Sequence, residues 1–287
     1  MSKKHIDEIS GVETTGHDWD GIRELNTPMP RWWVWTFCAT ILWAIGYAAA
    51  YPAIPMITSA TKGYIGFSSR GELQQDLNYA KAGKMAFQEM IAAKSVQEID
   101  ADSALREFAI AGGGSAFKVN CVPCHGSGAS GGPGFPNLND DDWLWGGDLK
   151  TIQTTIAHGI RFDGDADTNV SQMPGFADIL KPEQTKQVAA YVWGLTNIPS
   201  NPALAESGKQ IFLDNCAACH GEDAKGNAEI GAPDLADAIW LKGRGEDSIV
   251  RQVTAPKHGV MPAWGGRLGD TTIKELTVFV HSLGGGT

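Results

Sequence analysis

The sequence predicts an all-α protein with one N-terminal transmembrane helix followed by two tandem domains of a common design. Three observations support this prediction: a long uncharged segment near the N-terminus, a Cys-X-X-Cys-His pentapeptide that occurs twice, and matching residues at equal distances around both copies. The predicted regions are a tail (1–31), an anchor (32–57), a helical linker (58–103) and the two repeated domains (104–198 and 203–286).

The anchor is predicted from its length and its lack of charge. No charged residue occurs from Trp32 to Thr61. The first twenty residues of this segment, Trp32 to Tyr51, precede Pro52, which would interrupt a helix. Twenty helical residues rise about 30 Å, the thickness of a bilayer core. A signal peptide begins with a short basic segment, whereas the tail here is long and rich in acids, so a retained anchor is favoured. Cys38 lies within the span and is expected to be a small packing residue.

The repeated pentapeptide predicts two covalently bound heme c groups. Two thiols three positions apart each form a thioether to one vinyl group of a heme, and the following His meets the iron. The alternatives are a redox pair, a zinc site and two disulfides. A redox pair does not require that His, and neither Cys pair lies in a zinc-ribbon spacing. Four of the five cysteines are used in this way, so no disulfide framework is available. The copies are Cys121-Val-Pro-Cys124-His125 and Cys216-Ala-Ala-Cys219-His220.

The position of these motifs predicts the orientation of the chain. Both follow the span, and covalent heme attachment in bacteria takes place outside the cytoplasmic membrane. We therefore expect a single-pass protein of the bacterial inner membrane, with its N-terminus cytoplasmic and its heme domains periplasmic. Basic residues near the two ends of the span do not decide the matter. The net charge of −10 argues against a nucleic-acid partner and suits a basic partner such as a small cytochrome c.

Self-comparison of the chain shows an internal repeat. Gly and Phe lie one helical turn apart before each motif, which predicts close packing of that helix against a second one. Each copy ends in a similar helix, Pro182–Leu195 or Thr271–Leu283, and the first copy contains an Asp-rich insertion, Arg161–Gln172, expected to be a surface loop. The matched pairs are Gly113/Gly208, Phe117/Phe212, Asn120/Asn215, Pro136/Pro233, Leu138/Leu235, Trp143/Trp240, His158/His258 and Met173/Met261.

The order of a helix, the heme motif, an irregular loop, a Met before a Pro and a closing helix resembles class I cytochrome c domains. The resemblance covers both copies and implies that His125 and Met173 bind one iron. It likewise implies that His220 and Met261 bind the other. A thioether ligand stabilises ferrous iron, and iron with both axial positions filled moves electrons rather than substrates. The alternative for each Met is a residue that fills a gap in the core.

Several other residues are candidates for lesser roles. His158 and His258 are alternative ligands, but their matched positions favour a shared structural role. His281 is expected at the surface of the last helix. In the linker, Leu73–Ala93 has helical spacing and is expected to pack on the first heme domain or on a partner subunit. Heme-edge or propionate contacts are candidate roles for four residues, although core packing also explains the two tryptophans: Trp143, Trp240, Arg161 and Arg244.

The membrane segment is more specific than the heme motifs. Its motifs at Pro30–Trp35, 43–47 and 51–55, with two heme domains, resemble the diheme subunit (subunit III) of cbb3-type cytochrome c oxidase. That family passes electrons from a cytochrome c through two hemes to a monoheme subunit. The electrons then reach the heme–copper subunit, which reduces oxygen and pumps protons. The alternatives are the diheme cytochrome of another periplasmic complex such as a dehydrogenase, and a diheme peroxidase, which needs an iron with a displaceable ligand.

Overall fold

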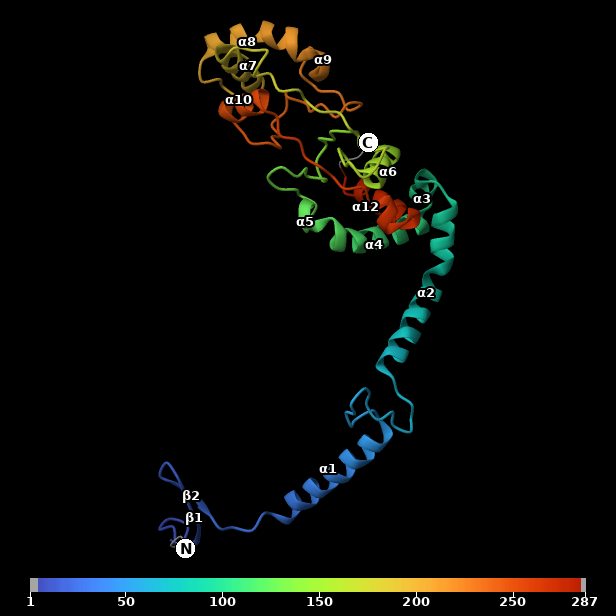
Figure 1. The fold of residues 1–287 in the computed structure, drawn as a ribbon, viewed down its shortest axis with the longest axis vertical. Helices are drawn as coiled ribbons and strands as arrows, with labels where there is room; N and C mark the ends of the chain where they lie inside the picture. The colour runs from blue at the N-terminus through green and yellow to red at the C-terminus, as the bar shows by residue number, and fades with distance from the viewer. Residues whose placement is uncertain (1–4, 285–287) are drawn as a thin grey trace. The chain divides into compact units, whose positions relative to one another are not determined.

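The computed structural model describes residues 5–284, which form two units that meet between residues 83 and 84 (Figure 1). The described chain is mostly helical, as predicted, with one two-stranded sheet. The first unit holds β1 (Thr14–Trp19), β2 (Ile22–Leu25), α1 (Arg31–Ala50) and the start of α2 (Ser69–Ala93). The second holds α3 (Val96–Ala101), α4 (Ser103–Asn120), α5 (Val122–His125), α6 (Leu149–His158), α7 (Pro182–Gly194), α8 (Pro202–Asn215), α9 (Ala217–His220), α10 (Glu246–Thr254), α11 (Gly265–Leu268) and α12 (Asp270–His281).

The N-terminal tail contains a β-hairpin that the sequence analysis did not predict. Strands β1 and β2 pair antiparallel, with Trp19 opposite Ile22 across a two-residue connection. The connecting residues, Asp20 and Gly21, both have positive φ, at 51° and 89°. Asp-Gly is typical of the tight hairpin turn whose twist matches that of the strands. The Asp-Gly pair is therefore a local signal for a hairpin, even though the mixed charge of the region indicated only a polar tail.

The predicted membrane span is observed as α1. The most apolar stretch of this helix has a mean hydropathy of 1.4, and Ala50 at its C-terminal end is its one buried residue. Its side chains are therefore free to face lipid, as a membrane anchor requires. The helix ends where Tyr51 adopts an extended conformation, one residue before Pro52. A proline at that place cannot continue the helical hydrogen-bond pattern.

The end of the linker packs onto the helices of the second unit. Ile91 of α2, Ile99 of α3 and Val278 of α12 are fully buried in one cluster with α4 residues. The ring of Phe87 stacks on that of Phe108, with centroids 4.8 Å apart. Ser95 and Glu98 form a reciprocal capping box that starts α3, which fixes the turn between the helices. The expected packing of the linker against a heme domain is thus confirmed for its C-terminal part.

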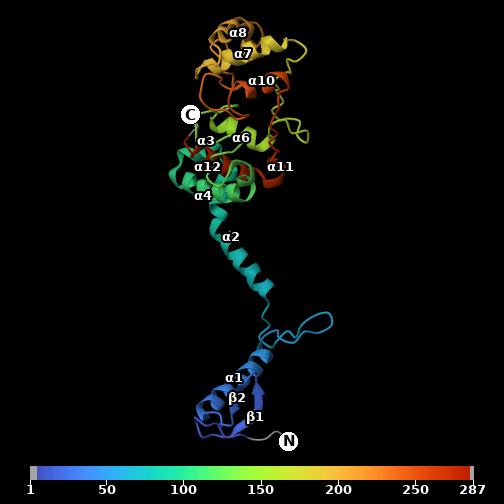
Figure 2. The same ribbon diagram turned by 90° about the vertical axis from the view of Figure 1, so that its left-hand side faces the viewer.

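The two sequence copies exchange their closing helices (Figures 1 and 2). Helix α12, from the end of the second copy, packs along α4 of the first, and α7 of the first copy packs along α8 of the second. A side chain at Gly113 would overlap the backbone of α12, and one at Gly208 would overlap that of α7. The glycines therefore permit the close approach predicted from the sequence, but each partner helix comes from the other copy.

Aromatic packing repeats across the two exchanged helix pairs. Phe117 of α4 packs on Phe279 of α12 with ring centroids 5.3 Å apart at an interplanar angle of 50°. Phe212 of α8 packs on Tyr191 of α7 with the same separation and the same angle. Equal geometry at both places shows that the exchange preserves the contact and changes only which copy supplies the second helix.

A test of this packing is the substitution Gly208→Ala. The added methyl group would overlap the carbonyl oxygen of Gln187, so we expect a loss of about 1–3 kcal/mol in unfolding free energy, typical of an overpacked core. Thermal unfolding of the purified protein, followed by far-UV circular dichroism, measures the change. The matched control is Gly83→Ala in α2, where nothing lies within 4 Å of the new atom. Equal stability of the two variants would contradict the close approach.

Candidate heme-binding sites

Each pentapeptide forms a short helical turn directly after a longer helix. Cys121 ends α4, and the backbone N–H of His125 donates to the Cys121 carbonyl at 2.9 Å. The next residue, Gly126, leaves the turn with φ of 79°. The second copy repeats this arrangement, since His220 donates to the Cys216 carbonyl at 3.0 Å. One helical turn brings the two thiols and the imidazole of each motif to the same side, where a single heme would lie.

Both motif histidines are prepared to bind iron as neutral imidazoles. Nδ1 of His125 lies 3.2 Å from the carbonyl oxygen of Pro136, and Nδ1 of His220 lies 3.0 Å from that of Pro233. A carbonyl oxygen only accepts, so Nδ1 carries the proton and Nε2 keeps its lone pair for a metal. Burial lowers the pKa of both histidines, with an opposing effect from the same hydrogen bond. The Pro136/Pro233 match in the repeat was the signal for this second layer of contacts.

The electrostatics of the thiols do not suit a redox pair. Burial raises the pKa of Cys121 to about 11, and it raises the pKa of Cys216 to about 11 as well. A catalytic thiol–disulfide pair instead contains a nucleophile of lowered pKa. None of the described cysteines forms a disulfide. Cys121 and Cys216 are therefore protonated thiols, the form that adds to a vinyl group in thioether formation.

The structure places each methionine with the motif of the other copy. Met261 and Cys121 both pack against the buried cluster that includes Phe117. Met173 packs on the other cluster, with Cys216 against it. This packing departs from the expected pairing of His125 with Met173 and of His220 with Met261. The repeat identified equivalent residues, but the exchange of α7 and α12 carries the preceding methionine loops across with them.

Hydrogen bonds to the backbone hold both methionine loops in these crossed positions. Ile160 and Met261 exchange two of them, with N···O distances of 2.9 and 3.0 Å. Nε2 of His258 lies 3.2 Å from the carbonyl oxygen of Met173. His258 thus has a structural contact, whereas its counterpart His158 has its Nδ1 3.1 Å from a carboxylate oxygen of Asp165. The two histidines share a position in the repeat but not a partner.

Trp240 provides a test of whether these residues fit a heme. Its indole Nε1 is buried and has no hydrogen-bond partner among the described residues. A buried N–H donor without an acceptor is costly, and a heme propionate is an acceptor of the required charge. Trp240 and Cys216 pack against the same buried cluster, so the unpaired indole N–H of Trp240 lies in the same site as the second motif. The residues therefore fit a heme with its carboxylates inside the protein.

The remaining candidates divide between the copies. The guanidinium of Arg244 lies over the ring of Trp193, 5.7 Å from its centroid, and its Nη2 lies 3.5 Å from Asn197. Arg161 instead contacts the backbone of both methionine loops.

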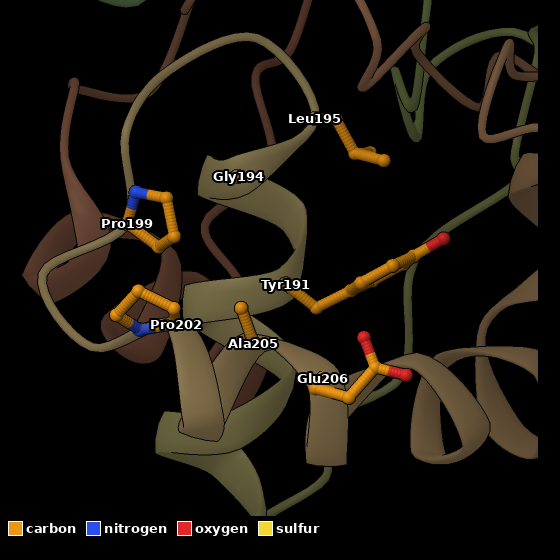
Figure 3. A pocket seen from close by; sticks show the side chains of 7 residues that line it. All are labelled: Tyr191, Gly194, Leu195, Pro199, Pro202, Ala205 and Glu206. Atoms are coloured by element: carbon orange, nitrogen blue, oxygen red, sulfur yellow. The ribbon is translucent and has the colours of Figure 1, made fainter.

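A shallow depression beside the link between α7 and α8 lies away from both pentapeptides (Figure 3). It is lined by Tyr191, Gly194, Leu195, Pro199, Pro202, Ala205 and Glu206.

An acidic cluster lies where the loops of the two copies meet. Burial, with the charges of neighbouring aspartates, raises the pKa of Asp142 to about 6. Burial also raises the pKa of Asp237. No described cation forms an ion pair with any member of the cluster. The cluster was not predicted from the sequence, because its members come from different copies of the repeat: Asp140, Asp142, Asp234 and Asp237.

Comparisons with known proteins identify the family of the chain. The family model for the N-terminal domain of cytochrome oxidase-cbb3, FixP, matches residues 11–58. The model for cytochrome c oxidase, cbb3-type, subunit III matches residues 108–192 and 203–280. A cbb3-type cytochrome c oxidase subunit FixPc of Rhizobium leguminosarum bv. viciae is 80% identical over 287 residues, all of both chains.

More distant relatives also match along nearly their whole length. The subunit FixP of Rhizobium meliloti (strain 1021) is 65% identical over 283 residues, covering 99% of this chain and 98% of its own. The subunit CcoP of Cereibacter sphaeroides is 48% identical over 275 residues, covering 95% of each chain. The similarity therefore includes the membrane segment, the linker and both heme motifs.

The substitution Asp142→Asn tests the acidic cluster. A carboxyl whose pKa is higher in the folded than in the unfolded chain binds its proton more tightly when folded. Folding stability therefore falls as the pH rises from about 4 toward the folded value of about 6. We expect Asp142→Asn to remove this loss and to stabilise the protein at pH 7 by up to about 2 kcal/mol.

Thermal unfolding at pH 5 and pH 7 measures the effect as the difference between variant and wild type. Asp141→Asn, at the exposed neighbouring carboxyl, is the control and should change little. A wild-type protein that loses no stability relative to Asp142→Asn over this pH range would rule out the coupled cluster.

Proposed function

This chain belongs to the subunit III family of cbb3-type cytochrome c oxidases, and from that premise we propose how it holds its hemes, how it is oriented and which partners it serves. As a member it is a membrane-anchored diheme electron-transfer subunit with two heme c groups and other oxidase subunits as partners. The observation that carries the more detailed proposal is the placement of Met261 beside the first motif and Met173 beside the second.

The proposed ligands cross between the copies. The first heme would be held by Cys121, Cys124, His125 and Met261. The second would be held by Cys216, Cys219, His220 and Met173. The packing clusters and the backbone bonds of the methionine loops support this assignment. Thioether ligands favour the ferrous state and fill the open coordination position, which suits outer-sphere electron transfer rather than peroxide chemistry.

The chain's own residues keep each site ready for electron transfer. Heme supplies the one-electron couple when bound. The Pro136 and Pro233 carbonyls fix the two imidazole rings, and buried aromatic residues such as Phe117 and Phe212 exclude water. Rigid ligands change little in geometry when the charge on the iron changes. Two such sites within one compact unit give electrons a path through a single chain.

The proposed orientation has the tail in the cytoplasm and residues 58–287 in the periplasm, with α1 in the bacterial inner membrane. The support is the order of the elements, because both heme motifs follow α1 and heme attachment takes place outside the cytoplasmic membrane. An alkaline phosphatase fusion at the C-terminus should be active in cells. Activity only with the fusion at the N-terminus would reverse the proposed orientation.

The proposed electron route begins at a cytochrome c donor and ends at the heme–copper subunit. Electrons pass through the two hemes of this chain to the monoheme subunit, and the catalytic subunit then reduces oxygen and pumps protons. The net charge of −10 supports a basic donor, since opposite charge steers encounter between proteins.

Stopped-flow reduction of the purified oxidase by a basic cytochrome c tests this route. We expect the second-order rate constant to fall about tenfold or more when salt rises from low to high ionic strength, because screening weakens the attraction. An acidic cytochrome c of similar potential is the control and should react more slowly at low salt. A rate that does not depend on salt would contradict electrostatic docking of the donor.

Single-heme variants test the crossed ligands. In the chain with Cys216→Ala and Cys219→Ala only the heme at the first motif remains. Adding Met261→Leu is expected to abolish the near-infrared sulfur-to-iron band of that heme and to lower its potential. Adding Met173→Leu instead should leave both unchanged. The opposite result would restore the pairing in chain order, and a heme-stained gel confirms that each variant still carries one heme.

A further inference from the structure

Arg161 joins the two methionine loops through one side chain. Its Nε donates to the carbonyl oxygen of Gly259 at 2.7 Å, and its Nη1 donates to that of Ser171 at 2.8 Å. Gly259 lies two residues before Met261, and Ser171 lies two residues before Met173. The two carbonyls thus lie at the same distance along the chain from the two methionines, and a single guanidinium binds both of them.

The backbone around Arg161 is built to hold this position. Arg161 has φ of 50°, in the left-handed region that side chains other than glycine seldom adopt. Its N–H donates to the Asn169 carbonyl at 2.7 Å, which closes the inserted loop. The preceding residue, Ile160, exchanges two backbone hydrogen bonds with Met261. Such conformations persist where the surroundings impose them, and they concentrate at functional positions.

The charge of Arg161 is not used in an ion pair. The residue is partly buried, and within the described chain no carboxylate forms an ion pair with it. Burial lowers the pKa of the guanidinium, and burial together with the charge of Arg161 lowers the pKa of Lys242. Backbone carbonyls are therefore its partners in the protein. A planar guanidinium presents several N–H groups in fixed directions, as two separate acceptors require.

We propose that Arg161 is a positioning residue that holds both methionine loops, so that sulfur ligation at the two hemes is coupled through one side chain. The proposal rests on the proposed function of Met173 and Met261 as axial ligands. It does not depend on which pentapeptide each methionine faces. Loosening of one loop would shift the guanidinium, and the second loop would lose the same support.

His258 provides an internal comparison, because its imidazole reaches only one of the loops. Its Nε2 lies 3.2 Å from the Met173 carbonyl, and Met261 has its own backbone pairing with Ile160. A variant of His258 should therefore disturb the Met173 loop alone. A variant of Arg161 should disturb both loops, which separates coupling from general destabilisation of the region.

The experiment uses the full-length heme-loaded protein in detergent with Arg161→Gln or Arg161→Lys. Each substitution is made in the wild type, in Met173→Leu and in Met261→Leu. The readouts are the near-infrared sulfur-to-iron band and the potentials of the two hemes. Arg161→Gln is expected to reduce the remaining band by more than half in both methionine variants and to lower both potentials in the wild type. Arg161→Lys keeps the positive charge but loses the two directed N–H groups of the guanidinium. It should therefore retain the band only in part.

Two controls define the specificity of the effect. Arg251→Gln removes the same charge from an exposed side chain of α10 that contacts Ser248, and it should leave the band and the potentials unchanged. His258→Phe should reduce the remaining band in Met261→Leu, where Met173 is the ligand left, and not in Met173→Leu.

Each outcome of the Arg161 series is decisive. An unchanged band in both methionine variants overturns the proposal, and loss in only one of them overturns the coupling. If Arg161→Gln carries too little heme on a stained gel, Arg161→Lys is read by the same criterion. Failure of the ligand assignment looks different, because Met173→Leu and Met261→Leu would then leave the band intact without any change at Arg161.

Discussion

The backbone of α4 lies so close to α12 at Gly113 that no side chain fits between them, and α8 meets α7 in the same way at Gly208. Both heme sites depend on these two contacts. Each closing helix comes from the opposite copy of the repeat, so neither site is completed by one copy alone. Residues 84–284 therefore form one compact unit in which two similar sites share their parts.

This exchange explains why the loops before α7 and α12 lie where they do. A methionine loop is short, and its helix is packed against the other copy, so the methionine must follow the helix. The backbone hydrogen bonds between Ile160 and Met261, and the bond from the His258 imidazole to the Met173 carbonyl, then fix each loop. Because both loops also bind Arg161, the two sites are connected by hydrogen bonds as well as by helix packing.

The two sites are alike in chemistry but differ in their surroundings. Both contain a neutral imidazole bound to a proline carbonyl, a buried phenylalanine and a tryptophan packed against the cluster. They differ in the inserted loop that begins at Arg161, which supplies contacts to both methionine loops and a carboxylate to His158. Unequal surroundings are the usual means by which proteins give similar hemes different potentials.

The sequence alone determined the membrane helix, the two heme motifs and the equivalence of residues such as Gly113 and Gly208. These depend on local composition and on spacing along the chain, which a sequence displays directly. The hairpin also had a local signal in its turn residues, Asp20-Gly21. It was not predicted, because the mixed charge of the surrounding residues indicated only an extramembrane tail.

Only the tertiary structure decided which helix meets which, and therefore which methionine lies beside which motif. Each closing helix packs one aromatic ring, Tyr191 or Phe279, on its partner helix, so this feature of composition does not assign the partners. The choice depends on loop lengths and on contacts between distant residues, including the two carbonyls bound by Arg161 and the acidic cluster around Asp142. A repeat identifies equivalent parts, but it does not identify which copy supplies each part.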